Sequence, residues 1–224
     1  MKAFVFDLFW TLIKPELQTD KPTENKIVGL SVQEWFEISE DHRVADDRYL
    51  GKDRNELEMI RKIVKLLPFE VPEEKIPLIL EARYERIRDA IINVKPEILS
   101  TLRKLKTAGY KLAIISNADT IDIHYWHQSP LKELFDEVIF SCDAGIIKTD
   151  EKIYRLAAEK LGISTNECFY IGDGGSNELE GARKSGMKTI LTEYFSVKDE
   201  PRRTKIKNDA DYIISDFKNL MEFI

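Results

Sequence analysis

Residues 4–12 of the chain read FVFDLFWTL, and this short stretch decides the fold. Its first three residues form an apolar run, which is typical of a strand buried on both faces. The run ends in a carboxylate, Asp7, and Phe9 stands two residues further on, where a second acid could assist a proton transfer. A buried strand that ends in one acid raises the question of which polar groups meet that acid.

The composition is that of a globular protein of modest size. The chain has 224 residues, which suits one α/β domain or a core with a smaller insert. Its formal charge of −6 argues against a general nucleic-acid binder. No apolar run is long enough to span a membrane, and the chain opens on a strand rather than a leader. We therefore expect a cytoplasmic protein with no nucleic-acid or membrane partner.

The cysteines and histidines offer no metal site of their own. Cys142 and Cys168 lie inside apolar runs, which predicts two small buried residues in a reducing compartment. His124 and His127 lie close together, but no third ligand stands near them at metal-binding spacing. We expect these histidines in a turn or at the edge of the core.

The second half of the chain alternates between apolar runs and amphipathic stretches. The strands are expected at residues 2–6, 111–116, 137–141, 168–173, 188–192 and 211–215, and the helices at 96–108, 151–162, 177–186 and 216–223, with a helix or turn region at 120–134. This alternation predicts an α/β protein with right-handed crossovers and a mostly parallel sheet.

Two other segments have a different texture. Residues 31–92 are dense in Glu, Arg, Leu and Ile at helical spacing, with prolines as punctuation, and predict a helical insert after the first strand. Residues 197–210 mix charges and predict a surface loop, in which Arg202, Arg203, Lys205 and Lys207 form a solvated basic cluster.

Polar side chains follow the predicted strands where each strand ends. Each of them alone is commonplace, because turns begin at strand ends. The carboxyl ends of parallel strands meet at one edge of a sheet, however, and ligands bind there. We therefore expect a site at this edge that brings together Asp7, Ser116, Asn117, Lys148, Asp173 and Glu178.

Four segments resemble, in order, the motifs of the haloacid dehalogenase-like (HAD) hydrolase superfamily. They are FDLFWTL with Asp7, LAIISNA with Ser116, GIIKTDEKIY with Lys148, and YIGDGGSNELEGARKSGM with Asp173 and Glu178. The motifs run from residue 4 to 187, and the helical insert resembles the small C1 cap of subfamily IA. The resemblance implies a three-layer, Rossmann-like core formed by residues 1–14 and 93–224, with a cap formed by residues 15–92.

The resemblance also implies a nucleophile and a metal. Asp7 would be the nucleophile, and a carboxylate in this role splits one difficult displacement into two easier ones. Attack on phosphorus gives an aspartyl-phosphate, and attack on a carbon that bears a halide gives an ester. Mg²⁺ prefers oxygen ligands. The implied ligands are Asp7, Asp173, the backbone carbonyl of Phe9, and Glu178 directly or through water.

The remaining motif residues would assist the phosphoryl group. Lys148 would offset negative charge on Asp7 and on the phosphoryl oxygens. Ser116 and the backbone of Asn117 would donate hydrogen bonds to those oxygens. Thr11 would orient the loop around the nucleophile.

Phe9 departs from the phosphatase pattern. Most phosphatases of the superfamily have an Asp at this place that protonates the leaving group, and such help is worth about 10²–10⁴-fold. The dehalogenase branch needs no such acid. Its fourth motif, however, has a small hydroxyl residue where this chain has Asp173, so the chain combines a dehalogenase-like first motif with a phosphatase-like fourth.

Three functions therefore stay open. The first is a Mg²⁺-dependent phosphatase that acts on a small phosphorylated metabolite, where a good leaving group such as an acyl or anomeric phosphate would need less acid. The second is a 2-haloacid dehalogenase or another carbon-centred hydrolase. The third is a weakly active or non-catalytic protein that keeps the fold for binding. We expect a monomer or a homodimer.

The predicted cap offers candidates for substrate contacts. Trp35 and Phe36 either pack on an apolar part of the substrate or belong to the core of the cap. Arg43 and Arg48 either hold an anionic group or are solvated partners of the nearby acids Asp41, Asp46 and Asp47.

Two further residues bear on the chemistry. Trp10 stands beside the nucleophile, where the superfamily usually has Gly or a small residue, and either narrows the pocket or packs against the cap. His42 is the cap residue that we would test as a replacement for the missing proton donor.

Overall fold

The computed structural model describes residues 1–16 and 21–224, and it contains a six-stranded sheet in the order β3-β2-β1-β4-β5-β6. The strands are β1 Ala3–Phe6, β2 Lys111–Ser116, β3 Glu137–Phe140, β4 Cys168–Gly172, β5 Lys188–Thr192 and β6 Tyr212–Ile214. Every pair of neighbours in this order is parallel. The predicted α/β class with a parallel sheet is confirmed.

The α-helices are α1 Glu24–Val28, α2 Val32–Ser39, α3 His42–Tyr49, α4 Glu56–Val64, α5 Ile76–Ile92, α6 Pro96–Thr107, α7 Thr120–Ile123, α8 Ser141–Ala144, α9 Lys152–Lys160, α10 Glu178–Lys184 and α11 Arg202–Lys207. Short 3₁₀ helices are η1 Glu73–Lys75, η2 Trp126–Gln128, η3 Thr165–Glu167, η4 Gly175–Asn177 and η5 Phe217–Phe223. Within the described residues, no helix is long and apolar enough to cross a membrane.

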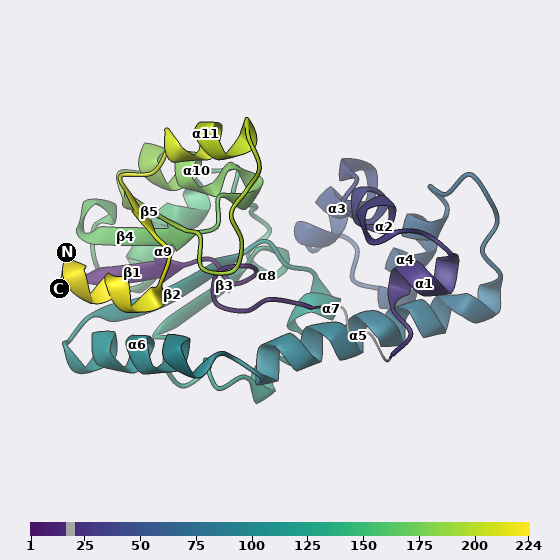
Figure 1. Ribbon diagram of the computed structural model, residues 1–224, viewed down its shortest axis with the longest axis horizontal. Helices are drawn as coiled ribbons and strands as arrows, with labels where there is room; N and C mark the ends of the chain where they lie inside the picture. The colour runs from purple at the N-terminus through teal and green to yellow at the C-terminus, as the bar shows by residue number, and fades with distance from the viewer. Residues whose placement is uncertain (17–20) are drawn as a thin grey trace.

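Helices cover both faces of the sheet, which gives three layers (Figure 1). Successive side chains of a strand point to opposite faces. Phe4 and Phe6 therefore pack into one apolar cluster with α6 and η5, and Ala3 and Val5 pack into another with α9, α10 and α11. The strands are apolar at consecutive positions because each face has its own helical cover.

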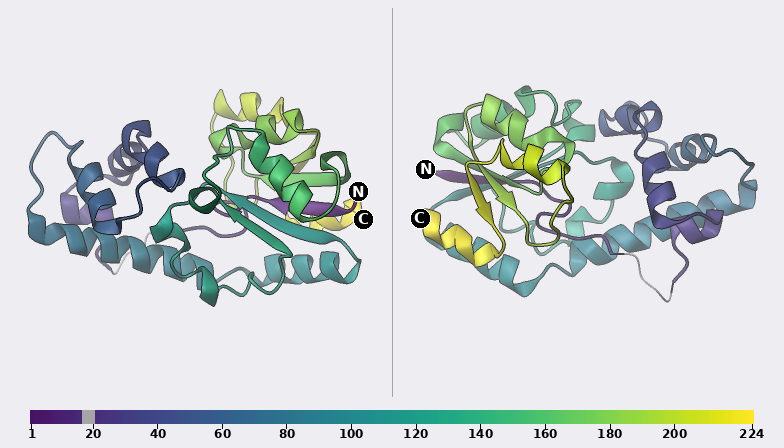
Figure 2. Two further views of the ribbon diagram at one scale, coloured as in Figure 1. Left: turned by 180° about the vertical axis from the view of Figure 1, so that it is seen from behind. Right: turned by 45° about the horizontal axis from the view of Figure 1, so that its top comes forward.

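Helices α1 to α4 lie beyond the carboxyl ends of the strands, at the right of Figure 1. They share an apolar cluster that includes Trp35, Met59 and Ile79, with Ile121 contributed by α7. Both views in Figure 2 show the long helix α5 running from this group back towards α6. The division into a core of residues 1–14 and 93–224 and a cap of residues 15–92 stays a prediction, and residues 17–20 of that cap lie outside the described residues.

Local sequence explains where several helices begin. Ser31 and Glu34 form a reciprocal capping box at the start of α2, with Glu34 N donating to Ser31 Oγ at 3.2 Å and Ser31 N donating to Glu34 Oε2 at 2.8 Å. Pro96 occupies the first turn of α6, where its missing N–H is not needed. The helix predicted at residues 96–108 is confirmed to start at Pro96, and it ends one residue earlier than expected, at Thr107.

The predicted loop at residues 197–210 is wrong in part, because it contains α11. The mixed charges of this segment indicated a solvated loop, but Ile206 is only 8% exposed and packs in the apolar cluster with Tyr170 and Leu179. The last predicted helix is a 3₁₀ helix, and α8 was not predicted. Helix α1 lies within the expected helical cap, before the stretch 31–92 whose spacing indicated helices.

Candidate active site at the carboxyl end of the sheet

The strand order reverses direction beside β1, with β2 and β3 on one side and β4, β5 and β6 on the other. Ligands of open parallel sheets bind outside the carboxyl ends of the strands at such a switch point. Asp7 follows β1 and Asp173 follows β4, and the two strands are adjacent. The Asp7 amide donates to the Ile171 carbonyl at 2.9 Å, which holds the acid at the tip of the sheet.

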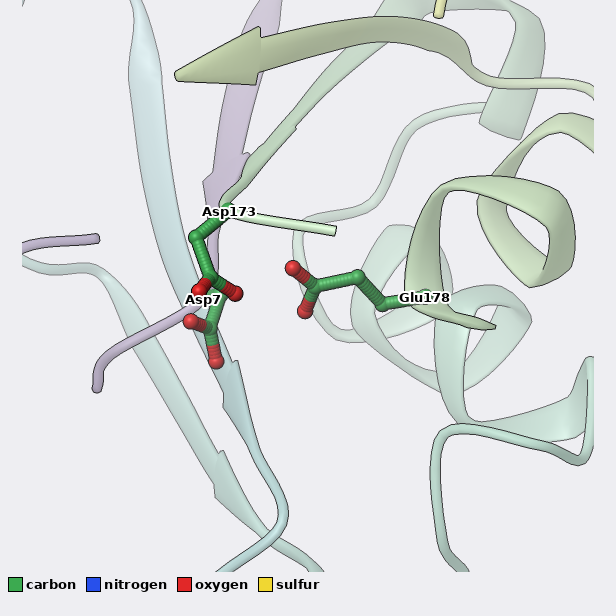
Figure 3. A group of neighbouring side chains, drawn as sticks. All are labelled: Asp7, Asp173 and Glu178. Carbon is green, nitrogen blue, oxygen red and sulfur yellow. The ribbon is translucent and has the colours of Figure 1, made fainter. Parts of the chain in front are cut away.

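Three carboxylates meet at this point. Asp7, Asp173 and Glu178 are buried and offer oxygen atoms that lie within 4.8 Å of one another. Figure 3 shows the first two side by side at the strand ends, with Glu178 reaching in from the start of α10. Gly172 makes this approach possible, because a β-carbon at that position would overlap the Glu178 carboxylate.

Lys148 lies between two of the acids. Its Nζ donates to Asp7 Oδ1 and, at 2.6 Å, to Glu178 Oε2. Asn117 Oδ1 accepts from the Lys148 backbone amide at 2.9 Å, and Tyr154 donates its hydroxyl to the Lys148 carbonyl at 3.0 Å. These contacts, from the residue that follows β2 and from α9, fix the segment that carries the lysine.

The protonation of these groups reflects their burial. Burial opposes the charge on Lys148, but the carboxylates of Asp7 and Glu178 outweigh it and raise the pKa of the lysine. Burial also raises the pKa of Asp7, with Lys148 opposing it. Burial, reinforced by the charge of Asp7, raises the pKa of Glu178 to about 8. The charges of Asp7 and Asp173 thus add to the cost of ionising Glu178 in this buried place, and a divalent cation with oxygen ligands fits this donor set.

A cavity of about 780 Å³ opens over the cluster. The predicted site residues that line it are Asp7, Phe9, Asn117, Lys148, Asp173 and Glu178. Thr11 and Ser116 are fully buried and are not among its described lining residues. Ser116 is the last residue of β2, the strand beside β1.

Lys198 also belongs to the site, and the sequence did not indicate it. Its Nζ lies 2.6 Å from Asp173 Oδ2 and it lines the cavity. The residue stands in the segment that we predicted to be a solvated surface loop. No motif links it to Asp173 across 25 residues, so only the path of the chain into α11 could reveal the contact.

The predictions for the charged cap residues have mixed outcomes. Arg43 is exposed and pairs with Asp41 at 2.7 Å, as one of its two interpretations held. Arg48 pairs with a nearby acid, Glu40, at 3.2 Å, but it is not solvated: its side chain is 1% exposed and donates to the buried Asp119 at 2.8 Å. It is not among the described residues that line the cavity. His42 is 82% exposed at its side chain and is not among the described residues that line the cavity.

Arg48 belongs to a buried ion cluster that joins the predicted cap to the core. Arg83 Nη2 of α5 donates to Asp119 Oδ2 at 2.8 Å and to Asp122 Oδ1 at 2.7 Å. Asp119 also caps α7, accepting from the Ile121 amide at 2.9 Å. The cluster follows directly on Ser116 and Asn117, so it fixes the loop that carries these two predicted site residues.

The remaining sequence predictions concern cysteine and histidine. Cys142 and Cys168 are free and buried as predicted, and burial raises the pKa of each thiol to about 12. His124 packs at 4.5 Å between ring centroids on Tyr84, at the edge of the helical cluster. Among the described residues, the one group of acids, cysteines and histidines placed to hold a metal is that of Asp7, Asp173 and Glu178.

Known proteins support the assignment that the motifs suggested. The model of a family described as haloacid dehalogenase-like hydrolase matches residues 1–186, and the chain belongs to this family. Glyceraldehyde 3-phosphate phosphatase of Methanopyrus kandleri is 28% identical over 66% of this chain and 61% of its own. (S)-2-haloacid dehalogenase 4A of Burkholderia cepacia is 34% identical over 44% of this chain and 43% of its own.

Solved structures share the fold. A HAD family enzyme of Bacteroides thetaiotaomicron, described as a complex with magnesium and inorganic phosphate, aligns with a TM-score of 0.63 and 20% identity over 90% of this chain and 98% of its own. The match to the Methanopyrus phosphatase spans less than two thirds of that relative's length. Family and fold are thus fixed, and both phosphatases and dehalogenases stand among the similar proteins.

Proposed function

We propose that this protein is a Mg²⁺-dependent phosphatase that acts on a small phosphorylated compound through a phosphoryl group carried on Asp7. The observation that carries the proposal is the buried group of three carboxylates around Lys148 at the switch point of the sheet. Like charges so close together destabilise one another unless a cation balances them. The similarity to a phosphatase and to a fold neighbour described with magnesium and phosphate agrees with this function.

The side chains would divide the work as follows. Asp7, Asp173, Glu178 and the backbone carbonyl of Phe9 would hold Mg²⁺, which when bound supplies positive charge for the approach of an anionic phosphate. Asp7 attacks phosphorus through one carboxylate oxygen, the bond from phosphorus to the leaving oxygen breaks, and water then hydrolyses the acyl phosphate to release inorganic phosphate and restore Asp7.

The other predicted residues assist this sequence. Lys148 offsets charge on Asp7 and on the phosphoryl oxygens, and the Ser116 hydroxyl and the Asn117 amide donate to those oxygens. Thr11 positions the loop after β1. We assign residues 15–92 to a cap that shields the reaction from water.

The leaving group must depart with little help. Phe9 lines the cavity where an acid would protonate the departing oxygen, and a phenyl ring carries no transferable proton. Substrates with a good leaving group, such as acyl or anomeric phosphates, would therefore react faster than simple alkyl phosphates.

Phe9 also favours a second candidate function. Attack of Asp7 on a carbon that bears a halide would release halide without an acid, and a 2-haloacid dehalogenase stands among the similar proteins. Asp173 argues against this alternative, because the resemblance gives the dehalogenase branch a small hydroxyl residue at that place.

The setting of the protein is part of the proposal. Cys142 and Cys168 are unpaired and buried, which agrees with a reducing compartment, and we propose a cytoplasmic enzyme on this ground. A monomer or homodimer stays a prediction.

Release of inorganic phosphate tests the proposal. The purified protein is incubated with acetyl phosphate, a sugar 1-phosphate and alkyl phosphates, in Mg²⁺ and in EDTA. We expect release that needs both Mg²⁺ and Asp7, so that Asp7→Asn abolishes it and the exposed control Asp46→Asn does not. Halide release from a 2-haloacid, with no phosphate release, would replace the proposal by the dehalogenase function. Release of neither phosphate nor halide would indicate a non-catalytic protein.

A further inference from the structure

Trp10 adopts a backbone conformation that its side chain disfavours. Its φ is 61°, in the left-handed region, where a residue with a β-carbon costs about 1–2 kcal/mol relative to the right-handed region. Burial in the core does not offset this cost, because Trp10 is 37% exposed and lines the cavity. Strain of this kind is concentrated at functional sites.

A second large aromatic side chain is exposed in the same cavity. Phe36 lies on α2, is 56% exposed and lines the cavity from the side of the helical group. Phe9 and Trp35 add further aromatic surface to the wall. The cavity that contains Asp7 therefore has aromatic side chains both on the loop after β1 and on α2.

The charges of the cavity are largely engaged already. Lys14, Arg83, Arg86, Lys148 and Lys198 line it, and each is paired with an acid. Arg202 also lines the cavity and is exposed, and no residue of the described chain forms an ion pair with it. Away from Asp7, the cavity thus offers aromatic surface rather than unpaired charge, with the Lys14 ammonium 5.6 Å from the centroid of the Trp10 ring. Its volume of about 780 Å³ accommodates a ring as well as a phosphoryl group.

From this wall and from Phe9, we propose that the substrates are aryl phosphates, whose phenol ring packs against Trp10 and Phe36; the inference rests on the phosphatase function proposed above. A phenol is a far better leaving group than an alcohol, so its phosphate ester does not need the missing acid. In the first step a bond forms between Asp7 oxygen and phosphorus, the aryl oxygen–phosphorus bond breaks, and the phenolate takes its proton from water.

Two substrates separate the inference from the function on which it rests. Phenyl phosphate carries the ring, and acetyl phosphate has a good leaving group without one. Trp10→Gly removes the indole and suits the positive φ, Phe36→Ala truncates an exposed ring, and Phe69→Ala is the control, since Phe69 is 44% exposed and is not among the described residues that line the cavity.

In Mg²⁺, we expect Trp10→Gly and Phe36→Ala to lower kcat/KM for phenyl phosphate about 3- to 10-fold more than for acetyl phosphate, mainly through KM, as the loss of one aromatic contact predicts. Phe69→Ala should shift neither ratio. Equal losses on both substrates would overturn the aromatic subsite and leave the phosphatase intact. Failure of wild-type protein to hydrolyse either substrate in an Asp7-dependent way would overturn the phosphatase and the subsite with it.

Discussion

Phe9 is the residue at which the chemistry of this chain departs from the phosphatase pattern. It stands two positions after Asp7, lines the same cavity and packs partly against the core. The resemblance implies that its backbone carbonyl is a metal ligand. Its side chain has no acidic proton to donate, unlike the Asp that most phosphatases of the superfamily have there. In the proposed reaction, Phe9 could therefore serve the metal site through its backbone, but its side chain could not protonate the leaving group.

Phe9→Asp should restore that assistance. We expect kcat for an alkyl substrate such as glycerol 3-phosphate to rise by about 10²- to 10⁴-fold, with a much smaller gain for acetyl phosphate, whose leaving group needs no proton. Phosphate release measures both. Phe9→Asn, which has nearly the shape of Asp but no acidic proton, is the matched control, and an equal gain in it would show that size rather than acidity limits the rate.

At the scale of elements, the buried ion cluster joins α3, α5 and the start of α7. Asp119 is fully buried and accepts from Arg48 and Arg83, each at 2.8 Å. Burial opposes the charge on Asp119, but the two guanidinium groups outweigh it and hold the pKa of Asp119 below its ordinary value. Helices α3, α5 and α7 are thus coupled through one carboxylate.

Asp119→Ala should destabilise the protein by about 3–5 kcal/mol, because it removes the buried carboxylate that two buried guanidinium groups share. The measurement is urea unfolding followed by circular dichroism. Asp143→Ala is the control: it breaks an exposed ion pair with Arg54, at 3.1 Å, and should cost less than about 1 kcal/mol. If the two variants lost the same stability, the cluster would not couple these elements.

The same carboxylate predicts a pH dependence. A group whose pKa is lowered on folding stabilises the protein above its unfolded pKa, near 4, and this contribution disappears as the pH falls through the folded value. The free energy of unfolding of wild type should therefore exceed that of Asp119→Asn at pH 7, and the difference should shrink below pH 4. A difference that stayed constant with pH would contradict the assignment.

For the molecule as a whole, the sequence predicts local order well and distant pairing poorly. The strands at residues 111–116 and 188–192 are confirmed at both ends because they are continuously apolar runs between turn residues. One interpretation paired Arg48 with acids near it in the sequence, and it does contact Glu40, whereas its buried partner, Asp119, is 71 residues away. Lys198 was missed for the same reason. Apolar periodicity is a local signal, and an ion pair across the fold leaves no local trace.

We expect a cation that binds the acid cluster to stabilise the whole molecule. Asp7, Asp173 and Glu178 repel one another when buried, so an ion that binds them in the folded chain shifts the unfolding equilibrium. At a Mg²⁺ concentration 100-fold above half-saturation we expect about 2.7 kcal/mol of stabilisation, seen as a rise in Tm that EDTA reverses.

Asp173→Asn removes one carboxylate of the cluster and should lose most of this rise, while the exposed control Asp46→Asn keeps it. Lys198 already lies 2.6 Å from Asp173 Oδ2, so a divalent cation must compete with its ammonium group for that oxygen. Lys198→Met should therefore lower the Mg²⁺ concentration that gives half of the Tm shift. If Mg²⁺ left the Tm unchanged in both wild type and Lys198→Met, the cation would not bind at the proposed site. The three buried acids at the tip of this sheet would then need another explanation.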